Sequence, residues 1–239
     1  WRQLGEPRGG GILLIADHAS AHVPDDIDLG IDPALLANHI AIDLGVAEVA
    51  ALLVEDGAVD AAILGGVSRL VVDCNREEDA PGVLPIASDG HAVPGNALDD
   101  VAREARLARF FRPYHDHIAT TIAARRPAMI LSLHSFTPSL ESHPDQARPW
   151  QVGVLYNQDA RLAPAAIAAL AAEGLNVGDQ QPYSGKLLNA TMNRHAEAND
   201  IPYVGIEMRQ DLVGDAAGQR LFAERLARMC NKVALNIGE

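Results

Sequence analysis

Short apolar runs alternate along this chain with longer segments in which apolar residues recur at helical spacing. Each run is bounded by glycine, proline or polar residues, which is typical of buried strands. The predicted strands cover residues 11–16, 61–64, 67–73, 128–133 and 151–156, a short stretch near Val177, and residues 203–208. The predicted helices cover residues 33–55, 99–126, 160–173, 192–198 and 216–237. This alternation predicts a three-layer α/β fold, with helices on both faces of a mostly parallel, mixed sheet.

Three of these helices carry histidines, one of them His195 in residues 192–198. In residues 33–55, His39 and Asp43 lie four positions apart and share one helix face, which is either a surface pair or turned towards the strand ends. In residues 99–126, His115 and His117 point to different sides, and both are expected to be solvated or capping residues. The same helix contains Pro113, which is expected to bend or break it.

Composition narrows the class of protein and its partners. The 239 residues are 48% hydrophobic and 21% charged, with no internal repeat or linker, so one domain over residues 1–239 is expected. The net charge of −13 argues against nucleic acids and anionic membranes as partners. No apolar run reaches the roughly 20 residues of a membrane span. The two cysteines are too few for a disulfide framework, so a cytoplasmic protein is expected, and its oligomeric state stays open.

Polar residues follow four of the predicted strands directly. They are Asp17-His18, Asp73-Cys74-Asn75-Arg76, His134-Ser135 and Glu207-Met208-Arg209. In an open α/β sheet, ligands bind beyond the carboxyl ends of the strands. One histidine after a strand is usually a turn or capping residue, but four such strand ends at one sheet edge predict a functional site.

The residue types at these ends match a catalytic zinc site. Two histidines and a carboxylate are the usual three protein ligands, and they leave a fourth position for water. Bound zinc lowers the pKa of that water to about 7. A further glutamate can act as general base, and an arginine can hold an anionic substrate group. Because this ligand set accepts several divalent ions, one divalent metal ion is predicted, with zinc preferred.

Other catalytic signatures are weak. Residues 66–70 lack the final glycine of a nucleophile elbow, and there is no H-E-x-x-H helix, Walker A loop or dinucleotide-binding glycine motif. Cys74 could act as a nucleophile with His134, but strand alternation turns it away from Asp73, which favours a packing role. A cysteine hydrolase would lose activity on thiol alkylation and keep it on metal chelation.

A longer series of motifs runs in order over nearly the whole chain, from about residue 11 to residue 225. The motifs are residues 17–20 (Asp-His-Ala-Ser), 39–45, 68–76, 88–90, 94–96, 111–115, 132–138, 148–150, 152–157, 182–185, 195–197 and 206–212. In this combination they resemble the N-formylglutamate amidohydrolase family. The resemblance implies a phosphorylase/hydrolase-like fold related to the zinc carboxypeptidases, and zinc-assisted hydrolysis of a formyl or other acyl amide on an amino acid.

The same resemblance implies a ligand set. His18 and His134 match the family's two strand-end histidines and are the expected metal ligands. Zinc carboxypeptidases carry a glutamate three residues after the first histidine, whereas this chain has Ala21 there. Asp43 is therefore the preferred third ligand, with Asp17 as the second choice.

The remaining roles also follow from the resemblance. Glu207 occupies the place of the general base. Arg69 and Arg76 are expected to clamp a substrate carboxylate or polarise the amide carbonyl, unless they pair with neighbouring carboxylates. His195 is expected to contact substrate or the tetrahedral intermediate, or to be a helix-terminus partner. The expected catalytic residues are Glu207, Arg76 and His195, and the expected substrate-binding residues are Arg69, Asn75, Ser135, Tyr183, Gly185 and Arg209, with Gly185 providing a turn or a close backbone approach.

The expected activity is that of a metal-dependent amidohydrolase in which activated water cleaves the acyl amide of a small N-acyl amino acid. N-formyl-L-glutamate is the first substrate to test. The acyl group and the side chain stay open, because the loop reads His-Ala-Ser at residues 18–20, unlike the family's histidine-degradation enzymes. The alternatives are a carboxypeptidase or deacylase of the same fold, and a non-catalytic binding protein that keeps the pocket. Glu207 argues against the latter, since a carboxylate binder gains nothing from a negative side chain beside its ligand.

Overall fold

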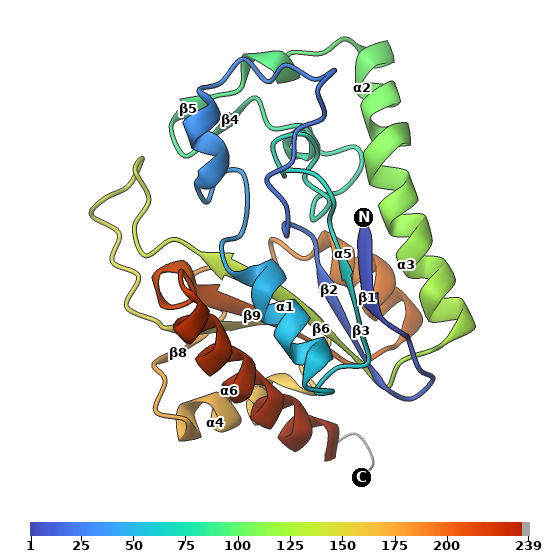
Figure 1. Ribbon diagram of the computed structural model, residues 1–239, viewed down its shortest axis with the longest axis vertical. Helices are drawn as coiled ribbons and strands as arrows, with labels where there is room; N and C mark the ends of the chain where they lie inside the picture. Colours follow the sequence, from blue (N-terminus) through green and yellow to red (C-terminus); the bar gives the residue numbers. More distant parts are fainter. Residues whose placement is uncertain (236–239) are drawn as a thin grey trace.

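A mixed sheet of seven strands forms the centre of the molecule (Figure 1). The structure is a computed structural model that describes residues 1–235. The strands lie in the order β1-β3-β2-β6-β9-β7-β8, with bounds Arg2–Gly5 (β1), Ile12–Ala16 (β2), Ala61–Leu64 (β3), Met129–Phe136 (β6), Val152–Leu155 (β7), Val177–Asp179 (β8) and Tyr203–Arg209 (β9). Strands β3, β2, β6 and β9 run parallel, whereas β1 is antiparallel to β3 and β7 is antiparallel to β9. The predicted mostly parallel, mixed sheet is confirmed.

Helices cover both faces of this sheet, which confirms the three-layer prediction. One face carries α1 (Val46–Glu55), α4 (Ala163–Ala172) and α6 (Ala216–Leu235), and the other carries α3 (Arg112–Ala124) and α5 (Ala190–His195). Successive strand residues point to opposite faces. In β2, Leu14 therefore packs with the first set of helices, whereas Leu13 and Ile15 pack with the second.

The helix predicted over residues 99–126 forms one continuous helical stretch. It consists of α2 (Asp100–Arg106), a π-helical turn at Leu107–Phe111 and α3. Pro113 lies in the first turn of α3 and does not break the stretch, because the π-helical turn before it accommodates the missing N–H. The predicted terminal helix corresponds to α6, and residues 236 and 237 of that prediction lie outside the described residues. Among residues 1–235, no helix has the length and apolar character needed to cross a membrane.

The helix predicted over residues 33–55 is wrong in its first half. A 3-10 turn at Pro33–Ala37 is followed by a non-helical segment, and α1 begins only after Gly45. Gly45 has a φ of 79°, and a Cβ there would collide with the backbone oxygen of Val213, so the turn requires glycine. His39 and Asp43 consequently do not share a helix face.

The strand predicted over residues 67–73 is also wrong. The apolar run is buried, but it forms turns outside the sheet. Leu70 and Val71 pack with Leu29, Ile40 and Val93 in a small separate core among the loops. A short apolar run indicates burial and does not by itself distinguish a strand from another buried segment.

The remaining elements are short. The sequence pattern does not predict β1, because its residues Arg2 and Gln3 are polar. Two two-residue strands, β4 (Ala87–Ser88) and β5 (His91–Ala92), form a separate hairpin. Further 3-10 turns lie at Pro81–Val83, Pro94–Asn96, Glu197–Asn199 and Gln210–Leu212. A loop layer lies beyond the sheet, in the upper part of Figure 1, and consists of residues 20–45 and 65–98 with the β4–β5 hairpin and the 3-10 turns within those ranges.

Candidate metal and active site

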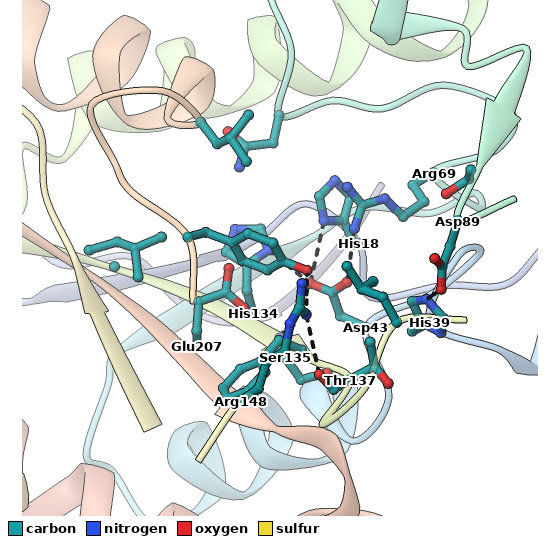
Figure 2. A pocket seen from close by; sticks show the side chains of 18 of the residues that line it. His18, His39, Asp43, Arg69, Asp89, His134, Ser135, Thr137, Arg148 and Glu207 are labelled. Atoms are coloured by element: carbon teal, nitrogen blue, oxygen red, sulfur yellow. Dashed lines mark hydrogen bonds and ion pairs between the residues drawn. The ribbon is translucent and has the colours of Figure 1, made fainter. Parts of the chain in front are cut away.

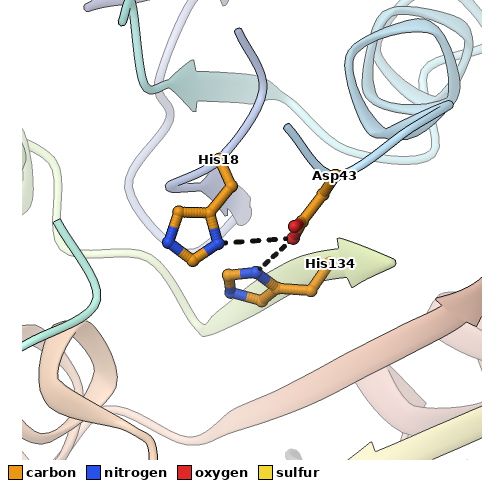
Figure 3. A group of neighbouring side chains, drawn as sticks. All are labelled: His18, Asp43 and His134. Carbon is orange, nitrogen blue, oxygen red and sulfur yellow. Dashed lines mark hydrogen bonds and ion pairs between the residues drawn. The ribbon is translucent and has the colours of Figure 1, made fainter. Parts of the chain in front are cut away.

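Three buried side chains from separate segments meet at the carboxyl end of the sheet. His18 follows β2, Asp43 precedes α1, and His134 lies near the end of β6 (Figure 3). Each offers one possible ligand atom, and these atoms lie within 4.8 Å of one another. Both histidines turn Nδ1 towards Oδ2 of Asp43, at 3.4 Å from His18 and 2.9 Å from His134. The structure thus brings together the two predicted histidines and the preferred third ligand.

Asp43 reaches this place because residues 38–45 are not helical, although their apolar spacing favours a helix. Its backbone N–H donates to the carbonyl of His18 at 3.0 Å, which ties the turn to the end of β2. The backbone N–H of Ser135 donates to Oδ2 of Asp43 at 3.3 Å. The glycine turn at Gly45 then starts α1 in a new direction. A continuous helix would have removed these contacts.

Two further carboxylates face the outer nitrogens of the histidines. His18 Nε2 donates to Oδ1 of Asp73 over 2.7 Å, and His134 Nε2 lies 3.5 Å from Oδ2 of Asp17. A carboxylate that accepts the Nε2 proton fixes the ring orientation and leaves Nδ1 for a metal. Asp17, the second choice for third ligand, is therefore placed behind His134 on the side away from Asp43.

Asp17 is held in place by a buried polar network. Its Oδ1 accepts hydrogen bonds from Tyr114 Oη and Thr191 Oγ1, both at 2.9 Å. Its Oδ2 and Nε2 of His134 are enclosed, and neither has a hydrogen-bond partner among residues 1–235. A shift of a few tenths of an ångström would turn their 3.5 Å approach into a full hydrogen bond.

Arg69 bridges two of the carboxylates. Its Nη1 donates to Oδ1 of Asp43 at 3.2 Å, and its Nη2 donates to Oδ2 of Asp73 at 2.9 Å. Burial opposes the charged form of the guanidinium, but Asp73 and Asp43 outweigh burial and raise the pKa of Arg69. The predicted pairing of Arg69 with neighbouring carboxylates is thus present, and this arginine helps to position the ligand set.

The carboxylates set the charge of the histidines. Burial alone would lower the pKa of His134, but the carboxylates of Asp17 and Asp43 beside its two ring nitrogens raise it well above its ordinary value. Burial and Arg69 likewise oppose protonation of His18, yet Asp73 and Asp43 raise its pKa. Burial acts to raise the pKa of Asp43, but the two histidines lower it. The acidic groups around the two imidazoles therefore favour positive charge at this place.

Glu207 lies beside His134 because the two residues occupy paired positions on the parallel strands β6 and β9. Its Oε2 is enclosed and has no hydrogen-bond partner within the described residues. Burial raises the pKa of Glu207 to about 7, against the attraction of His134. Gly153 faces it from β7, where a Cβ would lie 3.3 Å from Cβ of Glu207 and would collide with the carbonyl of Gln181. The sheet thus presents a carboxyl group that is free to accept a proton.

The residues present fit a divalent cation. Two imidazoles and a carboxylate are a catalytic zinc donor set, and Nδ1 of each histidine faces the shared oxygen of Asp43. The outer nitrogens have carboxylates opposite them, as metal-ligating histidines usually do. Asp17, Asp43 and Asp73 place more buried negative charge here than Arg69 balances.

A cavity of about 340 Å³ opens onto this ligand set (Figure 2). The predicted residues that line it are His18, Asp43, Arg69, Asn75, Arg76, His134, Ser135, Tyr183 and Glu207. Arg76 is the looser of the two predicted arginines, since its Nε lies 3.6 Å from Asp73. Ser135 uses its hydroxyl to donate to the carbonyl of Leu44, and Asn75 Oδ1 accepts from the backbone N–H of Thr191.

Three predicted residues do not line the cavity. Arg209 pairs with Asp211 at 2.8 Å outside it. Gly185 makes the expected close backbone approach, since a Cβ there would lie 2.5 Å from the carbonyl of Tyr156. His195 lies behind the site, in contact with His115. The structure places none of the three where it would touch a ligand in this cavity.

The expectation that His115 is a solvated or capping residue is wrong. His115 is buried, and its Nδ1 lies 2.9 Å from Nε2 of His195, so that one of the two donates to the other. Burial lowers the pKa of His115 to about 3 and that of His195 to about 4. His117 is half-buried, and its ring stacks on Trp1 at 3.6 Å between centroids. Helical spacing correctly predicts that His115 and His117 point to different sides, but it cannot predict that α5 covers His115.

Several residues of the site were missed by sequence reasoning. The sequence pattern marks Asp73 only as a strand-end residue, yet it contacts His18 directly. Arg148 lines the cavity, and the only sequence signal for it is the Arg-Pro-Trp motif. Asp89 also lines it, pairs with His39 at 2.9 Å and accepts the backbone N–H groups of Glu141 and Ser142. These residues come from loops, whose contacts no periodicity predicts.

Cys74 is buried in the apolar core beneath α3 and does not line the cavity. Burial raises the pKa of its thiol well above the ordinary value, and Asp17 and Asp73 raise it further. Thiolate formation is therefore disfavoured at the position that a cysteine hydrolase would use.

Comparisons with known proteins agree with this architecture. A crystal structure of the gene product Atu2144 from Agrobacterium tumefaciens is 31% identical, with a TM-score of 0.89, over 98% of this chain and 97% of that one. N-formylglutamate amidohydrolase from Ralstonia eutropha JMP134 is 17% identical, with a TM-score of 0.73, over 99% and 97% of the two chains. A search of curated proteins found no match.

The family itself is shown by a sequence model. The family model for N-formylglutamate amidohydrolase matches residues 10–213, which include every proposed ligand and Glu207. The segments that carried the resemblance lie almost entirely within this range. The chain belongs to the N-formylglutamate amidohydrolase family, whose model describes amide hydrolases.

Proposed function

We propose that this chain is a metal-dependent amidohydrolase that removes formate or another small acyl group from an N-acyl amino acid. N-formyl-L-glutamate is the first substrate to test. Family membership supports amide hydrolysis. One observation carries the metal and the mechanism: a two-histidine, one-aspartate group lines the same cavity as Glu207, whose enclosed Oε2 has no hydrogen-bond partner among residues 1–235.

His18, Asp43 and His134 are the residues that would hold the ion, for which zinc is proposed. When bound, such an ion polarises the amide carbonyl and makes water more acidic. Asp73 accepts from the outer nitrogen of His18, and Asp17 lies opposite the outer nitrogen of His134, so that the inner nitrogens would be available to the ion.

Glu207 is the proposed general base. Its unpartnered Oε2 would accept a proton from water and deliver it to the nitrogen that leaves when the amide is cleaved. Arg76, Asn75 and Tyr183 line the cavity and are proposed to contact the substrate. Arg69 is already engaged by two aspartates, and we propose that it acts mainly on the charge and position of Asp43.

Metal content and formate release, measured on the same samples, test the proposal. The samples are wild type, His18→Ala, His134→Ala and the matched control His22→Ala, an exposed histidine that does not line the cavity. We expect one zinc per chain and formate release from N-formyl-L-glutamate for wild type and His22→Ala, and the loss of both in the other two. Zinc binding without formate release would keep the metal site and reject the substrate. Failure of every sample to take up supplied zinc would reject the mechanism.

A further inference from the structure

Arg148 differs from the other arginines of the cavity. Its side chain lines the same cavity as Glu207 and is largely buried, with 9% of the residue exposed. Arg69 is neutralised by Asp43 and Asp73, whereas Arg148 forms no ion pair with any carboxylate among residues 1–235. A buried guanidinium without an anionic partner is costly, because burial removes its hydration.

The protein holds this guanidinium by one edge. Nη1 donates to the carbonyl of Thr137 at 3.2 Å and to Tyr183 Oη at 3.0 Å, and the guanidinium lies over the Tyr183 ring, 5.0 Å from its centroid. These contacts fix the plane of the group with neutral partners only. Figure 2 shows Arg148 beside Ser135 and Thr137 in the wall of the cavity.

The other edge of Arg148 is open. Within the described residues, Nε and Nη2 donate to no protein atom, and they are not among the enclosed atoms that lack a partner. Both nitrogens are therefore accessible, on a side chain that lines the cavity. Two parallel N–H groups of a guanidinium match the two oxygens of a carboxylate.

We propose that Arg148 is the carboxylate anchor of the site: its Nε–Nη2 edge binds a carboxylate of the N-acyl amino acid while the amide lies between Glu207 and the ligand set. This inference rests on the proposed function for the identity of the ligand. It restricts the substrate to a small anionic amide, since carboxylate and amide must fit one cavity of about 340 Å³.

Binding of three related probes tests this assignment. The probes are N-formyl-L-glutamate, N-formyl-L-glutamine and N-formyl-L-isoglutamine. N-formyl-L-glutamate keeps both carboxylates. In the glutamine probe the side-chain carboxylate is replaced by a carboxamide, and in the isoglutamine probe the α carboxylate is replaced. Calorimetry on the zinc-loaded full chain, with Glu207→Gln present throughout to prevent turnover, gives three dissociation constants. We expect one carboxamide to bind at least about tenfold more weakly than N-formyl-L-glutamate, since it loses a charged hydrogen-bond pair.

Variants then show whether Arg148 causes that difference. Arg148→Gln should raise the dissociation constant of N-formyl-L-glutamate by at least about tenfold. It should change the dissociation constant of the more weakly bound carboxamide by no more than about twofold. Arg148→Lys should restore part of the difference in affinity between N-formyl-L-glutamate and the carboxamide, because lysine keeps the positive charge but lacks the two parallel N–H groups. Arg228→Gln is the matched control, since Arg228 pairs with Glu173 outside the cavity and should change none of the constants.

Distinct results overturn the anchor and the proposed function. An equal loss for all three probes in Arg148→Gln, no loss in that variant, or no binding of any probe before Arg148 is changed would overturn the anchor. Thermal unfolding of each variant shows whether a loss comes from misfolding, in which case Arg148→Lys decides. Discrimination by Arg148 without formate release from the otherwise unaltered enzyme would keep the anchor and reject the hydrolysis.

Discussion

Two pairs of buried histidines in this molecule have nearly the same spacing and opposite chemistry. The rings of His18 and His134 lie 5.0 Å apart between centroids, and those of His115 and His195 lie 5.1 Å apart. The pKa values of the first pair are raised, whereas those of the second pair are lowered to about 3 and about 4. Burial acts in the same direction on both pairs, so burial cannot explain the difference.

The difference comes from the carboxylates around each pair. Asp43 lies between the rings of the first pair, and Asp73 and Asp17 lie outside them. The ring nitrogens of the second pair contact each other and the carbonyl of Cys74, so Asp17 acts on this pair without a hydrogen bond, Arg194 opposes protonation, and burial prevails. A buried histidine pair attracts a cation only where anionic groups surround it, which means that histidine spacing alone does not identify a metal site.

The largest expected effect is on the rate of formate release and concerns Glu207. This residue lies beside His134 of the first pair. Glu207→Gln removes the proposed base but keeps the shape, so formate release should fall roughly 100- to 10,000-fold. Zinc content should stay at the wild-type level, because Glu207 is not one of the three grouped ligands. An active Glu207→Gln enzyme would remove the catalytic difference between the two pairs.

The next effect concerns the outer carboxylate of His18. Asp73→Asn removes the charge opposite Nε2, and zinc affinity, measured by competition with a chromogenic chelator, should fall about 10- to 100-fold. Asp211→Asn is a suitable control, since Asp211 pairs with Arg209 away from the ligands. If the zinc affinity of Asp73→Asn were unchanged, the carboxylates around the first pair would not control its affinity for a cation.

The smallest effect concerns the second pair and appears as a dependence of stability on pH. The folded-state pKa of His195 is about 4, below its ordinary 6.5, so the unfolded chain binds more protons between these values. The neutral ring contributes its full stability above pH 6.5, and that contribution is lost as the pH falls towards 4. His195→Gln should reduce the acid-side slope of the unfolding free energy by up to about 1.4 kcal/mol per pH unit.

Denaturant unfolding at several pH values measures that slope. The same variant should keep its zinc and release formate within about twofold of the wild-type rate, because His195 does not line the cavity. Loss of zinc or of turnover in a folded His195→Gln protein would restore the catalytic role predicted for this residue and would end the distinction between the two pairs.

The parts of this fold that sequence patterns predicted correctly are those governed by regular backbone geometry. The strands that carry His134 and Glu207 are continuous apolar runs, and the open-sheet rule then places their ends at one edge. Asp43 was chosen through a family resemblance while its local structure was predicted wrongly, because helical spacing continues through a turn that Gly45 imposes. The sequence patterns do not predict the proposed role of Arg148, since that role depends on the lack of an ion pair between its guanidinium and any carboxylate of the described residues.

The paired positions of His134 and Glu207 have a consequence for how this site can diverge. Their backbones are neighbours across two hydrogen-bonded parallel strands, so their separation is the strand spacing of about 4.8 Å, set by main-chain geometry. Insertions and substitutions in the loops can reshape the cavity around Arg148 or Asp89 without altering that spacing. The separation of these two backbones is inherited with the sheet, whereas the shape of the cavity is free to change with the loops.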